Sequence, residues 1–305
     1  MPSARFTLTM LHPRYWPIWC GLGLLWLLVQ LPYPWQMAIG RRLGRLAMPL
    51  MKRRVQIARR NLELALPELD AAERERLLYA NFESVGCAIF ETGMAWFWSD
   101  RRMRRWMQIE GEEHVRNALA SGSGMLLLSC HFMTLELNAR MFGLLQPGVG
   151  VYRPNDNPVY EYAQVRGRTR SNKYLLDRAD IKGMVKALRK GEALWYAPDH
   201  DYGRHASVFV PFFAVEQSAT ITGTATLARV KNTVVLPCYT LRLPEGGYRL
   251  IIEAPLSDFP SGDELLDAGR SNRVIEAAVR RAPEQYMWLH RRFKTRPNRD
   301  DPSRY

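Results

Sequence analysis

Acidic side chains are missing from the first part of this chain, where no Asp or Glu precedes Glu63. Of the 43 Lys and Arg residues, ten lie in this stretch, so the remaining 33 nearly balance the 30 Asp and Glu residues. The formal net charge of +13 is therefore concentrated in one N-terminal segment. Such a distribution excludes a uniformly basic surface and indicates that one segment meets an anionic partner.

Cysteine is scarce, and the spacing of the four cysteines fits neither a disulfide framework nor a metal site. They are typical of small buried side chains in a reducing compartment. The six histidines do not cluster with them, so no zinc site is expected.

Charged side chains are also absent between Tyr15 and Gly40, where an apolar segment from Ile18 to Leu31 is flanked by aromatic residues. A spanning helix needs about 20 apolar residues, so this run is a little short. No small-residue cleavage site follows it, which argues against a signal peptide, and the surrounding arginines argue against a buried core helix. We expect a retained membrane-anchoring helix, with the basic cluster after it keeping the body of the protein in the cytoplasm.

Two long helical patterns follow the apolar segment. Residues 35–66 alternate apolar residues with arginines, which fits a basic amphipathic arm on an anionic membrane or a solvated face packed on the domain. Residues 71–98 carry a second apolar stripe. We expect residues 1–62 to form the anchor and arm, and residues 63–305 to form one catalytic domain.

Beyond Gly111 the sequence alternates strand and helix patterns, which predicts an α/β fold with a mostly parallel sheet flanked by helices. The expected strands are 125–130, 149–152, 174–176, 193–197, 208–213, 234–239 and 248–253. The expected helices are 113–120, 134–145, 159–166, 182–190, 220–230 and 265–282.

A histidine ends the first of these strands, and Glu136 follows His131 by five positions at the start of a predicted helix. An imidazole can take a proton from a hydroxyl near neutral pH, and a carboxylate on its other nitrogen orients the ring. No Gly-x-Ser-x-Gly elbow supplies a nucleophile, which favours direct attack by an acceptor hydroxyl. The alternative is a core histidine that caps the following helix.

The loop that begins at Asp199 is the second candidate, because Asp199, His200 and Asp201 follow a predicted strand. A hydrogen-bonded turn explains the same residues. A metal site is disfavoured, since successive side chains of an extended segment point to opposite sides.

Arginines form the third candidate. Arg153, Arg166, Arg168, Arg170 and Lys173 lie close in sequence, and Arg168 and Arg170 share one side of an extended segment. A guanidinium suits a phosphate or carboxylate, although solvated surface arginines explain any one of them. A fourth candidate, residues 288–294, mixes aromatic and basic side chains that fit lipid headgroups or simply complete the fold.

Four further blocks accompany the His131-x4-Glu136 spacing: residues 150–158, 198–203, 208–213 and 286–297. The spacing resembles the H-x4-D/E signature of glycerolipid and lipid A acyltransferases. With the four blocks, the chain resembles the bacterial late lipid A acyltransferases over almost its whole length, with lauroyl-transferring members as the nearest type.

The resemblance implies a glycerolipid-acyltransferase-like fold on the cytoplasmic face of the bacterial inner membrane. It implies transfer of a fatty acyl chain from acyl carrier protein to a hydroxyl of a hydroxyacyl chain on a Kdo-bearing lipid A precursor. His131 would be the general base and Glu136 its orienting partner. Arg168 would hold the acyl donor or a phosphate, and Asp199 would lie in the same pocket; Arg153 and Arg170 are further substrate-binding candidates.

No metal or cofactor is expected, because a thioester donor is already activated and needs only a base, positioning and stabilisation of the oxyanion. Expected partners are the carrier protein, the lipid acceptor and anionic membrane lipids. Two other functions remain open: acylation of a lysophospholipid or glycerol phosphate, and non-catalytic binding of membrane or nucleic acid. Nucleic acid is disfavoured, because the basic residues flank an apolar segment. Met133, Phe142 and Phe212 are apolar candidates for the floor of an acyl pocket.

Overall fold

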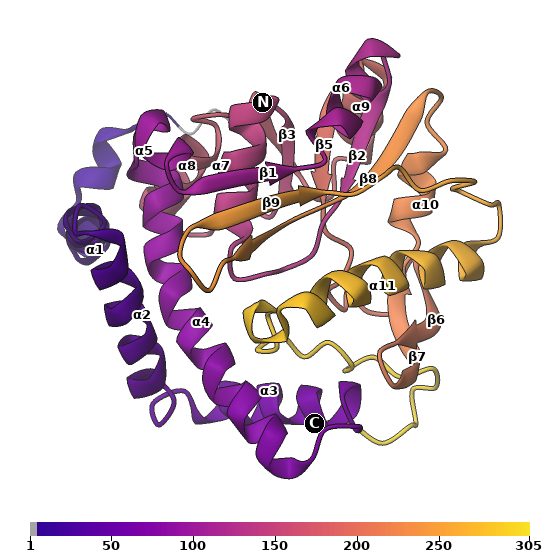
Figure 1. Ribbon diagram of the computed structural model, residues 1–305, viewed down its shortest axis with the longest axis horizontal. Helices are drawn as coiled ribbons and strands as arrows, with labels where there is room; N and C mark the ends of the chain where they lie inside the picture. Colours follow the sequence, from indigo (N-terminus) through magenta and orange to yellow (C-terminus); the bar gives the residue numbers. More distant parts are fainter. Residues whose placement is uncertain (1–4) are drawn as a thin grey trace.

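The computed structural model describes residues 5–305 and shows a seven-stranded sheet covered by helices on both faces (Figure 1). The strands are β1 (Met107–Glu110), β2 (Gly124–Leu128), β3 (Val149–Tyr152), β4 (Tyr174–Asp177), β5 (Ala193–Tyr196), β6 (Ser207–Phe212), β7 (Val215–Ile221), β8 (Thr233–Arg242) and β9 (Tyr248–Ile252). The α-helices are α1 (Trp16–Leu28), α2 (Tyr33–Ala47), α3 (Lys52–Ala65), α4 (Ala71–Phe97), α5 (Asp100–Arg104), α6 (Glu112–Ala120), α7 (Leu135–Leu145), α8 (Pro158–Arg168), α9 (Ile181–Arg189), α10 (Gly223–Ala228) and α11 (Glu264–Arg281). Short 3-10 helices cover Leu8–Leu11, Pro13–Tyr15 and Pro283–Gln285.

The sheet has the strand order β1-β9-β8-β2-β5-β3-β4, and only the β8–β9 pair is antiparallel. After β2 the chain passes through α7 toward β3, whereas after β5 it passes through α10 toward β8, on the other side of β2. The carboxyl ends of β2 and β5 therefore flank a point where the connections diverge. In open α/β sheets such a point forms a crevice that binds ligands.

Strand β2 runs through the centre of the core, and all five of its residues are buried. Because side chains alternate along a strand, Leu126 and Leu128 pack into one hydrophobic cluster and Met125 and Leu127 into another. The first cluster contains residues of α9, α10 and α11, and the second contains residues of α4, α6 and α7. A continuous apolar run is what a strand buried on both faces requires.

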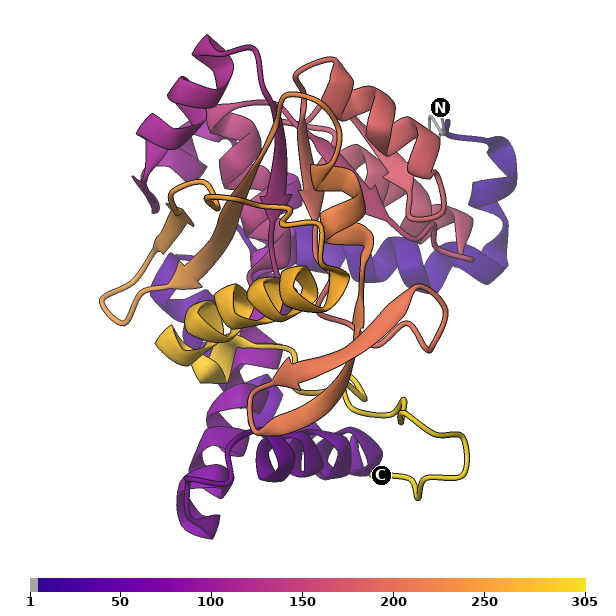
Figure 2. The ribbon, with the colours of Figure 1, turned by 90° about the vertical axis from the view of Figure 1, so that its right-hand side faces the viewer.

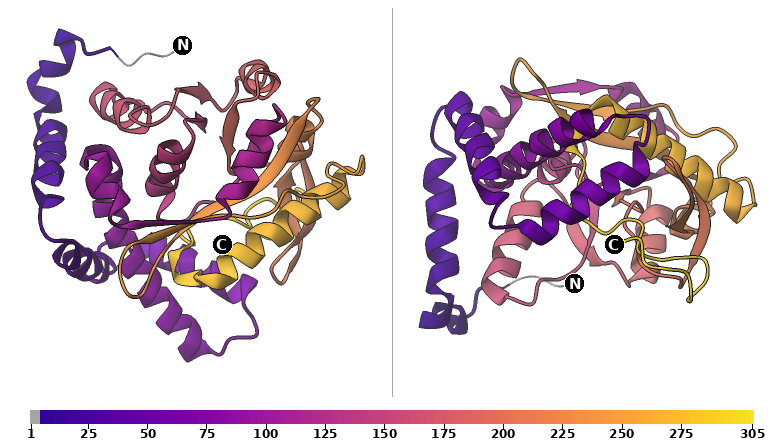
Figure 3. Two further views of the ribbon diagram at one scale, coloured as in Figure 1. Left: turned by 45° about the horizontal axis from the view of Figure 1, so that its top comes forward. Right: turned by 90° about the horizontal axis from the view of Figure 1, so that it is seen from below.

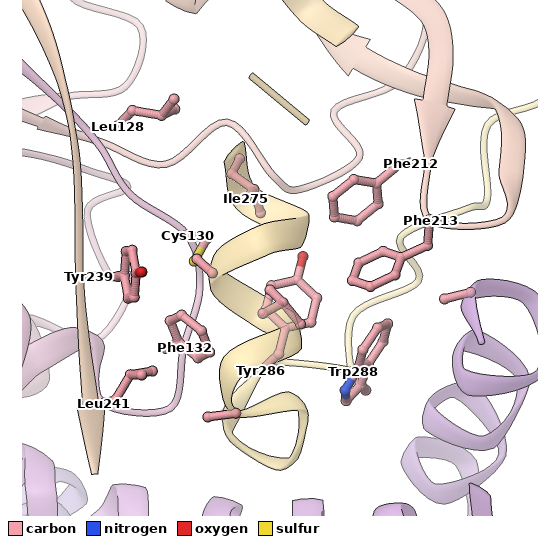
Figure 4. Packing of buried hydrophobic residues seen from close by; sticks show 14 of the residues in the cluster. Leu128, Cys130, Phe132, Phe212, Phe213, Tyr239, Leu241, Ile275, Tyr286 and Trp288 are labelled. Carbon is pink, nitrogen blue, oxygen red and sulfur yellow. The ribbon is translucent and has the colours of Figure 1, made fainter. Parts of the chain in front are cut away.

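The β6–β7 pair forms a separate antiparallel ribbon that packs against α11 (Figure 2). Phe212 and Phe213 at the end of β6 lie in the same cluster as Trp288, and Figure 4 shows these aromatic side chains beside the end of α11. The aromatic cluster ties the ribbon and the C-terminal segment to the sheet.

The expected α/β fold with a mostly parallel sheet is confirmed, and so is the helix expected over 220–230, which is α10 at Gly223–Ala228. Two strands, β1 and β7, were not expected. The single helix expected over 35–66 is two helices, because the chain turns between Met48 and Met51. Local propensity at these places was overridden by pairing with neighbouring strands and by packing against α4.

The expected membrane-anchoring helix is not seen as a spanning element. Helix α1 has 13 residues, which at 1.5 Å per residue is about 20 Å and falls short of the ~30 Å hydrocarbon core. Within residues 5–305, no helix is both long and apolar enough to cross a membrane. The first four residues of the expected arm lie outside the described part of the chain.

Helices α1, α2 and α3 follow one another along the edge of the molecule, as the two views of Figure 3 show. Helix α2 packs along α4 through glycines, because a Cβ on Gly44 would overlap the carbonyl oxygen of Phe82 and one on Gly86 would overlap that of Gly40. Its outer side exposes large apolar residues, including Trp35, Leu43, Leu46 and, just past the helix, Leu50.

Candidate active site

His131 and Asp199 form the central pair of the site, and each follows one of two adjacent parallel strands. Strands β2 and β5 are paired through Leu128 and Tyr196, and the amide of Ser129 continues this pairing by donating to the Tyr196 carbonyl. His131 lies three residues beyond β2 and Asp199 three residues beyond β5. Because the carboxyl ends of parallel strands meet at one edge, the two side chains reach each other across the crevice.

Asp199 holds both the backbone and the ring of His131. The carboxylate is fully buried; Oδ2 accepts from the His131 amide at 2.9 Å, and Oδ1 lies 2.6 Å from the ring nitrogen Nδ1. Burial alone raises the pKa of this carboxyl, but the charge and hydrogen bonds of His131 outweigh it, and the net shift is downward. An ionised Asp199 fixes the proton on Nδ1 and leaves the lone pair of Nε2 available as a base.

Glu136, expected to orient His131, is paired with Arg168 instead. Nε of Arg168 is 3.1 Å from both carboxylate oxygens, Nη2 is 2.5 Å from Oε1, and Nε1 of Trp96 donates to Oε2 at 2.9 Å. Burial raises the pKa of Glu136, but the charge and hydrogen bonds of Arg168 and the bond from Trp96 lower it further than burial raises it.

The physical reason for the different pairing is the helix that begins between the two residues. Helix α7 begins at Leu135, so Glu136 lies in its first turn, where it faces the end of α8 and Trp96 of α4. Asp199 already occupies Nδ1 of His131. The five-residue spacing thus places both groups in one site without making them partners.

Three imidazole rings form a stack at the centre of the site. The His131 and His200 rings lie 3.5 Å apart at 12°, and the His200 and His290 rings lie 4.0 Å apart at 18°. Burial and the charge of His131 lower the pKa of His200 far below its ordinary value, and the same two causes lower the pKa of His290 to about 4. The rings of His200 and His290 are therefore neutral near pH 7.

A cavity of about 440 Å³ opens beside this stack. His131, Glu136, Arg168 and His200 are among the polar side chains that line it. The rest of its wall comes largely from apolar residues of β2, β3, β4 and α7, including Leu127, Phe142, Val149, Val151 and Leu175. A cleft of this volume, lined mainly by apolar side chains with a few polar groups, suits a long apolar ligand with a reactive head.

Some of the remaining sequence candidates line this cavity, and others lie outside it. Arg153 lines it and is 3.7 Å from Asp156 at the surface. Arg170 lies outside it, because Arg168 ends α8 and the chain then turns, so Arg170 donates to the Trp96 carbonyl at 3.0 Å. The expected extended segment that would align the two arginines does not form. Met133 and Phe142 also line the cavity, whereas Phe212 packs in the ribbon cluster.

Within residues 5–305, one group of three side chains has metal-ligand spacing. Ligand atoms of His131, Asp199 and His200 lie within 4.8 Å of one another. They converge because residues 199–203 form an irregular loop, in which Asp199 and His200 reach the same ring. The two imidazole rings are nearly parallel, so their nitrogen lone pairs lie in separate planes, and Asp199 already binds Nδ1. This arrangement suits proton transfer better than coordination of one ion.

Two contacts were not expected from the sequence: the hydrogen bond from Trp96 to Glu136 and the stacking of His290 on His200. Trp96 belongs to the end of α4, and from the sequence it was only part of the helical pattern over residues 71–98. His290 is held by two contacts: its Nε2 accepts from the Asp201 amide at 3.2 Å, and its carbonyl accepts from Asn61 at 2.6 Å. For His290 the available signal was the aromatic and basic run 288–294, the fourth candidate from the sequence.

Comparisons with known proteins identify the family of this chain. Residues 3–295 match the family model described as bacterial lipid A biosynthesis acyltransferase. The chain is 56% identical to the lipid A biosynthesis lauroyltransferase of Escherichia coli (strain K12), over 99% of this chain and 98% of that protein. It is 49% identical to the palmitoleoyltransferase of the same strain over 97% of each chain, and 28% identical to its myristoyltransferase over 96% of this chain and 91% of that protein. The chain belongs to the bacterial lipid A biosynthesis acyltransferases and is an O-acyltransferase.

Proposed function

We propose that this enzyme transfers a fatty acyl chain, lauroyl or one of similar length, from acyl carrier protein to a hydroxyacyl chain of a Kdo-bearing lipid A precursor. The observation that carries the proposal is the Asp199–His131 pair, whose imidazole lines a largely apolar cavity. The pair supplies a base, and the cavity has room for an acyl chain beside it.

The reaction is a direct displacement. Nε2 of His131 takes the proton of the acceptor hydroxyl as its oxygen attacks the thioester carbonyl carbon. A carbon–oxygen bond forms, the carbon–sulfur bond breaks, and the departing thiolate takes the proton from the imidazolium. Asp199 stabilises the imidazolium between these steps, and the neutral ring of His200 covers one face of it.

The Glu136–Arg168 pair belongs beside the donor. Both side chains line the cavity and are mostly buried, so the guanidinium is held in place by its carboxylate and by packing. Nη1 of Arg168 has no hydrogen bond within residues 5–305, and a ligand oxygen can accept from it. We assign Arg168 to the acyl donor or a substrate phosphate, with Glu136 and Trp96 as its positioning residues. Arg153, at the same cavity, is a second contact of this kind.

The N-terminal arm supports association with the cytoplasmic face of the inner membrane. Its exposed side chains include Trp16 (59% exposed), Trp35 (63%), Leu46 (68%) and Leu50 (86%), and arginines lie between them. Exposed apolar residues interleaved with cations suit the interface of an anionic bilayer. We therefore propose an arm that lies in the interface beside the lipid acceptor.

The test is acyl transfer by purified enzyme, with lauroyl carrier protein as donor and the Kdo-bearing precursor or lysophosphatidate as acceptor. Wild-type enzyme should acylate the precursor, and His131→Ala should lose at least about 10³-fold in rate because the base is gone. The His131→Ala enzyme should still sediment with anionic vesicles. Near-normal turnover by His131→Ala would refute the role of the base. Preference for lysophosphatidate would refute the acceptor.

A further inference from the structure

A second hollow, of about 460 Å³, lies between α3 and the C-terminal segment. Four arginines line it, two from α3 (Arg53 and Arg60) and two from the C-terminal segment (Arg291 and Arg304). Figure 2 shows the C-terminal segment returning to α3 at this place, and the Arg60 side chain donates to the Arg304 carbonyl at 2.8 Å. No acidic side chain of the described residues lines the hollow.

The positive charge of this arginine pocket is poorly neutralised. Within residues 5–305, Arg60 is the only one of the four that pairs with a carboxylate, at 3.0 Å from Glu63. Arg53 has neither a hydrogen bond nor an ion pair there. The Arg291 guanidinium lies 4.9 Å from the centre of the Tyr305 ring, and its buried Nε has no partner. Burial and the charges of Arg296 and Arg60 lower the pKa of Arg304, although the Tyr305 hydroxyl opposes this.

The arginine pocket lies next to both the exposed apolar arm and the catalytic stack. Leu50, which is 86% exposed, precedes Arg53 by three residues. On its other side, Arg291 follows His290, whose ring stacks on His200. A lipid whose acyl chains lie at Leu50 would thus hold its polar headgroup at the level of the arginines.

We propose that the arginine pocket binds an anionic group, a phosphate or a sugar carboxylate, on the headgroup of the lipid acceptor. This inference rests on the proposed function, because it assigns the pocket to the acceptor of that reaction. Guanidinium groups form paired, charge-assisted hydrogen bonds with such anions, and a partly buried pocket strengthens them. Binding there anchors the headgroup while the hydroxyacyl chain reaches His131.

The experiment compares wild-type enzyme with the double variant Arg53→Gln/Arg291→Met. Neither side chain donates a hydrogen bond or pairs with a carboxylate in the described chain, and Met keeps an apolar stem against Tyr305. Arg189→Gln, an exposed arginine in the last turn of α9, is the matched control. Thermal unfolding of all three proteins checks that each is folded.

Kinetics of acyl transfer should show KM for the lipid acceptor raised about 10-fold or more in the double variant, with kcat and KM for the acyl donor unchanged. Inorganic phosphate should compete with the acceptor for wild-type enzyme and Arg189→Gln, and much less for the double variant. Together these results support a headgroup site.

Other outcomes overturn the inference. A rise in the KM for acyl carrier protein would assign the pocket to the donor protein. Loss of phosphate inhibition with an unchanged acceptor KM would make it a site for free phosphate. If neither the acceptor KM nor the inhibition by phosphate changed in the double variant, the pocket would not be an anion-binding site. Failure of wild-type enzyme to acylate the precursor would instead refute the proposed function.

Discussion

The His131 ring is oriented by the carboxylate of Asp199, a residue 68 positions away in sequence. Asp199 binds both its backbone amide and Nδ1, so the ring has one tautomer and one orientation. Its neighbour Glu136, close in sequence, serves Arg168 instead. The two carboxylates therefore have separate partners, and we propose that Asp199 supports the base whereas Glu136 holds a cation beside the substrate.

Replacing Asp199 with Asn should lower kcat by about 10³-fold or more, because the amide favours the wrong tautomer of His131 and no longer stabilises the imidazolium. Asp177→Asn, at the carboxyl end of β4, is a matched control that should leave kcat unchanged. Acyl transfer at saturating donor and acceptor measures the effect. A loss of less than about tenfold in Asp199→Asn would show that the carboxylate is only a structural partner.

The pairing of helices α2 and α4 decides where the arm lies on the body of the protein. Gly40, Gly44 and Gly86 let the two helix backbones meet without side chains between them. The stacked rings of Tyr33 and Trp106, 4.2 Å apart, fix the start of α2 against the segment before β1. The exposed apolar face of α2 is thereby held in a fixed orientation relative to the cavity beside His131.

Substituting Gly44 with Ala should destabilise the protein by about 2 kcal/mol or more, because the new Cβ would overlap the Phe82 carbonyl and force the helices apart. Gly21→Ala is the control, since a Cβ there meets no atom within 4 Å and Ala is the better helix former. Chemical denaturation of both variants measures the difference. Equal stability would mean that α2 is not packed tightly on α4.

Three segments that are far apart in the sequence meet at the stack of histidine rings. His131 comes from the middle of the sheet, His200 from the loop after β5, and His290 from the C-terminal segment that α3 holds through Asn61. Loss of water around the rings of His200 and His290 lowers their pKa, so their neutrality depends on the folded state.

Stability should therefore fall as the pH is lowered from about 6.5, where unfolded histidine titrates, toward about 4, the pKa of folded His290. In that range the unfolded chain binds protons that the folded chain does not. The free energy of unfolding therefore decreases as the pH is lowered. His290→Gln should flatten this dependence by about 1–2 kcal/mol between about pH 7 and pH 5.

Denaturation at the two pH values measures this effect, with His205→Gln, at an exposed position, as the control. An unaltered slope in His290→Gln would contradict a buried neutral ring. The carboxyl groups of Glu136 and Asp199 act in the same direction at lower pH, because their folded pKa values lie below their ordinary ones.

The alternation of apolar segments and turns was enough to predict the α/β class, the helices on both faces and most element bounds. The run 125–128 could be recognised as a central strand because burial on both faces demands continuous apolar residues. The histidine at its end and the family blocks identified the chemistry. These signals are local, since they depend on residues within one element.

Only the tertiary structure decided the pairings across the site. Asp199 and Glu136 were both named from the sequence, yet their partners depend on the pairing of β2 with β5 and on how α7 faces α8. The stack of three rings and the arginine pocket combine segments more than 60 residues apart, such as α3 and the C-terminal segment. Sequence patterns report which face of an element is buried, whereas contact between elements depends on how those faces pack.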